Sequence, residues 1–262
     1  MLNKKRKETQ GRLRLRQVQQ VSFLLLLMML TSGCLYPAQS NSDPKTAYRE
    51  SVNRIQSAID AFQKDEGILP ILNADADTPK YEKFRIDLPK LKQHGYLDDI
   101  PGTAFESGGS AYFLVQNEEV QPTVKVMDLQ TMQKVNDVQR MVNQYKSNHN
   151  QELPAGEELY PGFHAVDMDK AAQAGSPSIT LNSVYSGQEL PFMMDTQGIV
   201  YVDYAFDIMQ ALEKADGSFD APNSGDVSDL RDHLLTHSYF VPVKSVPYKL
   251  ENNTPVAYLA PN

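Results

Sequence analysis

The sequence VNRIQSAIDAFQKDEGILP, residues 52–70, has the pattern of a helix followed by a turn. Its apolar residues are three or four positions apart, the spacing of one face of an amphipathic helix: Val52, Ile55, Ile59 and Phe62. Gly67 comes next and can adopt the left-handed conformation that ends many helices. We therefore expect a helix that packs against a core and ends near Gly67.

The same spacing recurs twice downstream. The second apolar face consists of Val135, Val138, Val142 and Tyr145, and the third, less regular one of Ala205, Ile208, Leu212 and Ala215. Asp87 and Asp167 follow the first two and are expected to be N-caps of short helices. Short β-favouring runs close the units at 111–115, 199–204 and 256–259. The pattern predicts an α+β fold of two to three related small units, each an amphipathic helix, a loop, a short helix and a β-hairpin.

These units follow two N-terminal segments of different composition. We expect residues 1–33 to be a lipoprotein signal peptide and residues 34–50 a tether rich in proline, serine and asparagine. The predicted α+β units span 51–134, 135–204 and 205–262. Chance recurrence of helical spacing is the alternative to a true repeat.

Cys34 is the only cysteine of the chain and follows the small pair Ser32-Gly33, an order typical of bacterial lipoproteins, although Thr31 stands where leucine is commonest. A basic segment and an apolar run of about ten residues precede it, the layout of a signal peptide. A membrane-spanning helix needs about 20 apolar residues. We expect Cys34 to carry covalent diacylglycerol, with palmitate-type chains, at the extracytoplasmic face of the cell membrane. An ordinary secretory signal or an uncleaved anchor is the alternative.

The charge of the chain indicates which partners to expect. The whole chain has a formal net charge of −8, and residues 1–33 hold seven Lys or Arg residues against Glu8, which leaves −14 for the remainder. Such an acidic protein repels phosphate backbones, so we expect no nucleic-acid partner. The expected partners are the membrane, through the lipid anchor, and an envelope protein or a wall polymer.

Two resemblances to known families concern different parts of the chain. Residues 55–70, with the later Gly95-Tyr96-Leu97 and Ile100-Pro101, loosely resemble the globular part of type II secretion pseudopilins. The whole-length pattern, including residues 33–37 and Phe105-Glu106-Ser107-Gly108-Gly109, is similar to YphF-like lipoproteins of Gram-positive bacilli. The second resemblance implies an outward-facing anchor on the cytoplasmic membrane, and it brings no catalytic residues.

The sequence holds no familiar catalytic motif, so we assign no catalytic residue, and the ligand-binding residues are unknown. His233 and His237 are the metal candidates, because residues four apart share a helix face, and Asp229 and Asp232 are near enough in sequence to add oxygen ligands. The alternative is that both histidines lie at the edge of a packed face. We expect no bound metal and no cofactor other than the lipid on Cys34.

Three functional classes fit these observations. We favour a noncatalytic, envelope-associated interaction module of a membrane-anchored lipoprotein. A solute-binding lipoprotein of an importer is the first alternative, but it requires two lobes of alternating strands and helices. An enzyme that acts on the cell wall through paired carboxylates is the second.

Overall fold

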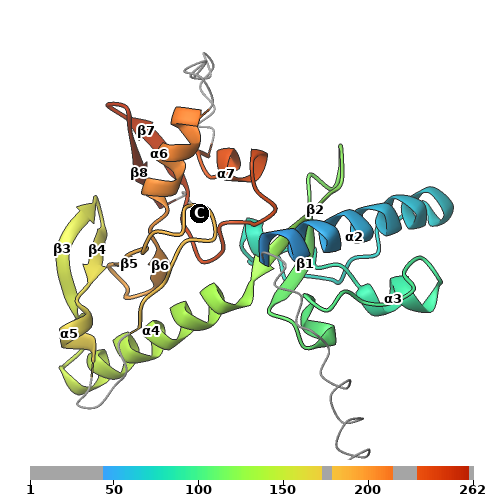
Figure 1. Ribbon diagram of the computed structural model, residues 1–262. Coiled ribbons are helices and arrows are strands. Elements are labelled where there is room, and N and C mark those ends of the chain that lie inside the picture. Colours follow the sequence, from blue (N-terminus) through green and yellow to red (C-terminus); the bar gives the residue numbers. More distant parts are fainter. Residues whose placement is uncertain (1–43, 173–178, 215–228, 260–262) are drawn as a thin grey trace, which may run out of the picture. The chain divides into compact units, whose positions relative to one another are not determined.

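The computed structural model describes residues 44–172, 179–214 and 229–259 (Figure 1). The chain from Pro44 onward forms one compact unit. The predicted signal peptide, Cys34 and residues 34–43 lie outside the described residues. Residues 44–50 were assigned to the tether, but they form the first turns of a helix, because Tyr48 packs against the core there. Within the described parts of the chain, no helix combines the length and the apolar character that crossing a bilayer requires.

The first core lies between a long helix and a β-hairpin. Its elements are α2 (Pro44–Glu66), η2 (Lys80–Glu82), α3 (Leu88–Gln93), η3 (Phe105–Ser107), β1 (Ala111–Gln116) and β2 (Thr123–Asp128). Strands β1 and β2 are antiparallel, with Ala111 opposite Asp128. The predicted apolar face of α2 is fully buried and packs on this hairpin: Val52, Ile55, Ile59 and Phe62.

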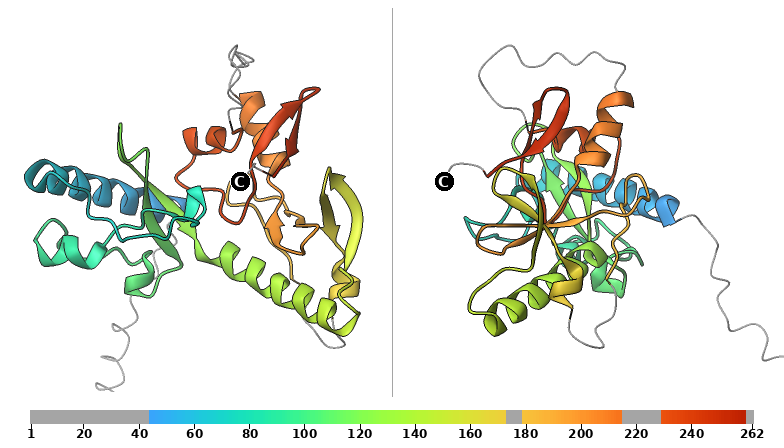
Figure 2. Two further views of the ribbon diagram at one scale, coloured as in Figure 1. Left: turned by 180° about the vertical axis from the view of Figure 1, so that it is seen from behind. Right: turned by 90° about the vertical axis from the view of Figure 1, so that its left-hand side faces the viewer.

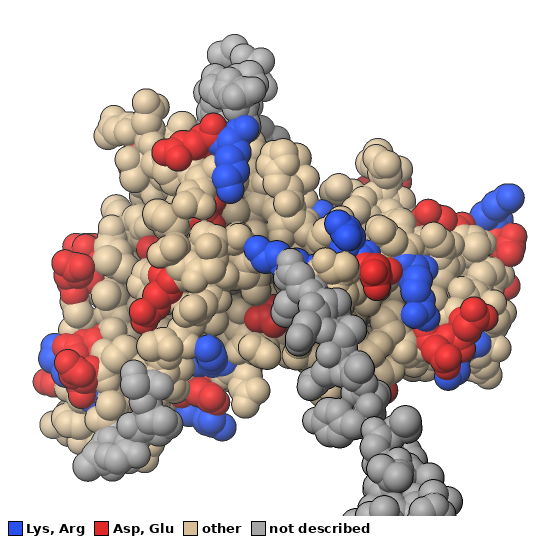
Figure 3. Space-filling view, in the orientation of Figure 1, with Lys and Arg blue, Asp and Glu red and all other residues tan. Residues whose placement is uncertain are grey.

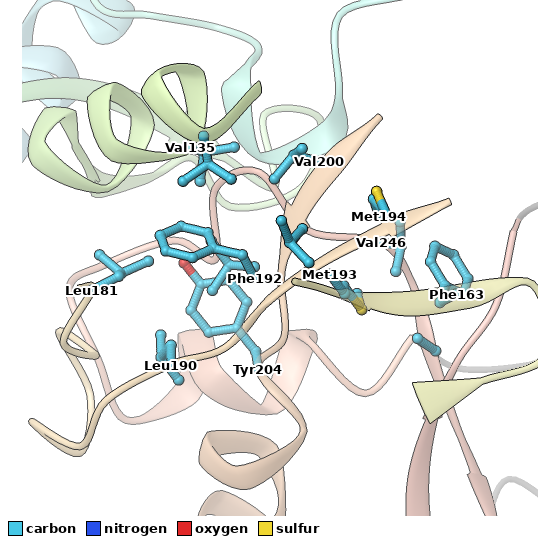
Figure 4. Packing of buried hydrophobic residues seen from close by; sticks show 14 of the residues in the cluster. Val135, Phe163, Leu181, Leu190, Phe192, Met193, Met194, Val200, Tyr204 and Val246 are labelled. Atoms are coloured by element: carbon cyan, nitrogen blue, oxygen red, sulfur yellow. The ribbon is translucent and has the colours of Figure 1, made fainter. Parts of the chain in front are cut away.

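The second core is formed by elements that follow β2. Helix α4 (Leu129–Asn148) directly follows β2 and leads to β3 (Ala155–Tyr160), β4 (Phe163–Val166), α5 (Met168–Ala171), β5 (Phe192–Asp195) and β6 (Val200–Val202) (Figure 2). These four strands form one antiparallel sheet in the order β3-β4-β5-β6. Helices α6 (Ala205–Lys214) and α7 (Asp232–Thr236) and the hairpin of β7 (Tyr248–Glu251) and β8 (Thr254–Ala257) complete it. Figure 4 shows part of this core, including Phe192, Met193 and Tyr204.

The predicted α+β class is confirmed, whereas the predicted repeat of units is not. The carboxylates of Asp87 and Asp167 accept hydrogen bonds from the backbone N–H groups of Lys90 and Lys170, both at 3.0 Å, as N-caps do. However, residues of the second and third predicted units share a single cluster that runs from Val135 to Ala257. The second and third predicted units therefore share one core, and the predicted boundary between them at residue 204 does not separate two cores.

A segment near the end of the chain joins the first core. Phe240 forms a parallel bridge with Val126, whose N–H donates to the Tyr239 carbonyl at 2.7 Å. The Phe240 ring is buried in the first core and meets Tyr48 edge to face, at 5.1 Å between centroids. Residues 239–241 therefore extend the edge of β2 and tie the C-terminal part of the chain to the first core.

Candidate functional site

A pocket of about 220 Å³ lies beside the segment that joins the two cores. Helix α6 contributes one face to it, at offsets of zero, three, four and seven: Asp207, Gln210, Ala211 and Lys214. The opposite lining comes from α7 and the residues after it: His233, Leu234, His237, Ser238, Tyr239 and Phe240. Lys45, Val184 and Tyr185 complete the lining. The pocket thus combines apolar walls with a few polar groups, the usual composition of a ligand site.

Asp207 is the unusual member of this lining, because its side chain is only 2% exposed. Its Oδ2 accepts a hydrogen bond from the Ser183 hydroxyl at 2.7 Å, but its Oδ1 has no hydrogen-bond partner among the residues that the structure describes. Burial raises the pKa of the Asp207 carboxyl, and the nearby hydroxyls of Ser186 and Ser183 oppose that rise. A buried carboxylate with one unsatisfied oxygen is costly, which sets Asp207 apart from the other residues of the lining.

The start of α6 is held in place by a second buried aspartate. The Oδ1 atom of Asp203 accepts hydrogen bonds from the Tyr248 hydroxyl at 2.8 Å and from the Ala205 N–H at 2.9 Å. Its Oδ2 accepts from the Tyr160 hydroxyl at 2.9 Å. These bonds connect α6 to β3 and β7, so they fix the helix face that carries Asp207.

Helix α7 is positioned by a network of charged and aromatic side chains. The Asp232 carboxylate accepts from the Tyr81 hydroxyl at 2.8 Å and pairs with the Lys80 ammonium at 2.7 Å. Arg231 pairs with Asp229 at 2.6 Å, and its guanidinium lies 4.7 Å from the centre of the Tyr81 ring. Since Tyr81 belongs to the first half of the chain, this network also joins α7 to it.

The two metal candidates of the sequence analysis, His233 and His237, do come together, and both line the pocket. The aspartates considered with them face other partners, because Asp229 pairs with Arg231 and Asp232 with Lys80. In the described parts of the chain, no three residues among His, Cys, Asp and Glu are grouped closely enough to hold a metal ion. The histidines therefore contribute to a pocket wall.

Asp207 was not identified from the sequence. Its spacing from Gln210 and Lys214 marks a polar helix face opposite Ile208, but such a face is usually solvated. What removes Asp207 from water is the loop containing Ser183 and Tyr185, far away in the sequence. Only the tertiary structure shows this burial.

The comparisons with known proteins concern the first core. Residues 48–128 match the family model described as the YphF family N-terminal domain. The predicted resemblance to the YphF-like family is confirmed over these residues. The matched residues run from within α2 to the end of β2 and include most of the first core, whereas most of the pocket lining follows them in the sequence. No curated protein and no solved structure matches the chain, so the resemblance to pseudopilins stays a prediction.

Proposed function

We propose that this chain is a membrane-anchored extracytoplasmic lipoprotein that acts as a noncatalytic binding module, with the Asp207 pocket as its recognition site. The observation that supports this proposal is the buried Asp207 carboxylate, which lines the pocket and has one oxygen without a partner among the described residues. Buried polar groups without a hydrogen-bond partner are uncommon in native proteins, and a functional role is one explanation for them. The segment before Cys34 supports the membrane anchor.

Binding fits this pocket better than hydrolysis does. Asp207 is the single carboxylate among the described lining residues, whereas hydrolysis of a glycosidic bond usually requires two carboxyl groups at a set separation.

The size of the pocket also favours a solute-binding role as the second candidate. The described sheets, however, are antiparallel, unlike the two α/β lobes of an importer's binding protein. Figure 3 shows acidic and basic side chains interspersed on one face, so charge is not concentrated into one large patch there.

The anchor is tested by Cys34→Ala in the full chain, with Ser32→Ala as the matched control. We expect Cys34→Ala to leave the membrane fraction or to accumulate as an unprocessed precursor, because the thiol that accepts the lipid is gone. Ser32→Ala keeps a small residue at its position and should fractionate like the wild type. Unchanged processing and fractionation of Cys34→Ala would contradict the anchor.

The binding role is tested by thermal unfolding of the detergent-extracted full chain with a panel of small molecules. The panel contains amines, carboxylates, neutral sugars and wall-polymer fragments. A ligand of the pocket raises the Tm with saturating dose dependence. Ala211→Trp, which fills the pocket, should abolish the shift, while Phe206→Trp on the exposed side of α6 should keep it. The proposal fails if no compound shifts the Tm, or if Ala211→Trp responds as the wild type does.

A further inference from the structure

We infer that the pocket binds a small organic carboxylate, whose negative group is held by Lys214 and His237 and whose apolar body packs on the aromatic wall. This inference rests on the binding role proposed above and adds the chemical class of the ligand. Its basis is the distribution of charge in the lining, where two basic side chains are exposed and the acid is buried.

Basic residues dominate the charge of the lining. Among the described residues around the pocket, Lys45, Lys214, His233 and His237 are basic, whereas Asp207 is the single acid. This local excess contrasts with the formal net charge of the whole chain, which is −8. A hollow with low-dielectric walls and basic side chains raises the local concentration of anions. The pocket therefore favours a negatively charged ligand.

The acid in the lining is not available to a ligand. Asp207 is 2% exposed, and its Oδ1 is buried, so a molecule in the pocket does not contact this atom. Its Oδ2 accepts the hydrogen bond from the Ser183 hydroxyl, which offsets part of its negative charge. The neighbouring carboxylates do not line the pocket either, since Asp232 pairs with Lys80 and Glu213 lies outside the lining. The charged groups that a ligand can contact are therefore the basic ones.

Lys214 and His237 provide donors for the carboxylate from two different elements. Lys214 lies in the last turn of α6, and His237 directly follows α7. Both are exposed, and neither side chain forms a hydrogen bond or an ion pair within the described parts of the chain. An ammonium group donates three hydrogen bonds, and a histidine ring donates at least one in either tautomer. Both groups can therefore donate to the oxygens of one anion.

The remaining lining selects the body of the ligand. Tyr185, Leu234 and Phe240 form an apolar wall, against which a polar group would lose its hydration without compensation. The volume of about 220 Å³ is below the range of roughly 300–1,000 Å³ that is usual for drug-sized ligands, which indicates a small molecule. Inorganic phosphate fits less well, because it has no apolar part to cover this wall.

The test uses isothermal calorimetry on the detergent-extracted full chain with benzoate and isovalerate. Benzamide and isovaleramide are the matched neutral probes, and inorganic phosphate is the anion without an apolar body. The variants are Lys214→Gln, His237→Gln and their combination. Lys64→Gln is the matched control, because Lys64 is also an exposed lysine in the last turn of a helix but does not line the pocket. Thermal unfolding of each variant without ligand establishes that it is folded.

We expect at least one of the two carboxylates to bind and its amide to bind about tenfold more weakly or not at all, because the amide lacks the charge that strengthens the hydrogen bonds. Each single variant should weaken binding about 2- to 5-fold and the double variant about tenfold, while Lys64→Gln binds as the wild type does. Ala211→Trp should abolish binding.

Equal affinity for the amide or for inorganic phosphate would overturn the inference, as would full affinity in the double variant or in Ala211→Trp. If amines, sugars or wall fragments bind in the pocket but neither carboxylate does, the inference fails and the proposed function stands. A protein that binds nothing in either experiment would contradict both.

Discussion

At the scale of single residues, two buried aspartates four positions apart play different parts. Asp203 is 8% exposed and accepts three hydrogen bonds from Tyr160, Tyr248 and the backbone of α6. Asp207 accepts one hydrogen bond, from Ser183, and its other oxygen has no hydrogen-bond partner among the described residues. Because both carboxylate oxygens of Asp203 accept hydrogen bonds, Asp203 is a structural residue. Because one oxygen of Asp207 lacks a partner, Asp207 is a candidate for a functional role.

Asp203→Ala should lower the free energy of unfolding by about 3 kcal/mol, because it leaves one buried hydroxyl, one half-buried hydroxyl and one N–H without their acceptor. Tyr160→Phe removes only one of those bonds and should cost about 1 kcal/mol. Urea unfolding followed by circular dichroism measures both. Similar losses in the two variants would show that Asp203 does not hold the network together.

The buried tyrosines predict a fall in stability at alkaline pH. Burial raises the pKa of Tyr201 to about 12, and it raises the pKa values of Tyr160, Tyr204 and Tyr248 further. In the unfolded chain these hydroxyls ionise near pH 10. Since the folded state binds the protons more tightly, its stability is fully present below about pH 10 and is lost as the pH rises above it.

Because the chain has no tryptophan, tyrosinate absorbance reports this ionisation directly. We expect most of the increase in absorbance to coincide with unfolding measured by circular dichroism. If all tyrosines ionised near pH 10 in a chain that remained folded, the buried network would be disproved.

At the scale of elements, local chemistry could be predicted and long-range pairing could not. The buried face of α2 and the capping aspartates Asp87 and Asp167 were predicted correctly, since helical spacing and cap chemistry depend on neighbours in sequence. The turn between β5 and β6 contains Gly198, whose positive φ is a local requirement of the same kind. The start of α2 at Pro44 was missed, because the tertiary packing of Tyr48 outweighs a local composition typical of a tether.

The turn between β5 and β6 provides a test of this local chemistry. Gly198 has a φ of +84°, and a Cβ at this position would lie 2.7 Å from Cδ2 of Leu153. Gly187 has a φ of +76° and open space around it. In both alanine variants the left-handed conformation lowers the free energy of unfolding by about 1 kcal/mol, but only Gly198→Ala adds a steric clash.

We expect Gly198→Ala to lose about 1–3 kcal/mol more than Gly187→Ala in urea unfolding. The difference isolates the contact with Leu153, because the two positions share the same backbone strain. Equal losses would mean that the Leu153 side chain moves aside freely.

At the scale of the whole molecule, the sequence predicts the α+β class but not the grouping of elements into cores. Similar helical faces at Val135 and Ile208 suggested separate units, yet both residues belong to one core. A periodic face indicates that a helix is buried and gives no information about the partner that buries it. For the same reason, nothing near Phe240 in the sequence shows that its ring belongs to the first core.

Phe240→Ala tests the connection between the two cores. Deleting a buried ring should cost about 3–5 kcal/mol, while Tyr239→Ala at the more exposed neighbour should cost much less. Hydrogen exchange should show faster exchange of the Val126 amide in Phe240→Ala, because its acceptor is the Tyr239 carbonyl. Unchanged protection of Val126 would show that residues 239–241 hold their place without the ring.

The pairing of Val126 with Phe240 also determines when the molecule can finish folding. The two residues are more than a hundred positions apart, so a chain that emerges from its N-terminal end completes β1 and β2 long before the segment that covers their edge exists. Contacts between distant residues slow folding, and an uncovered strand edge is a site of misassembly. The edge of β2 therefore stays uncovered until residues 239–241 are available to pair with it.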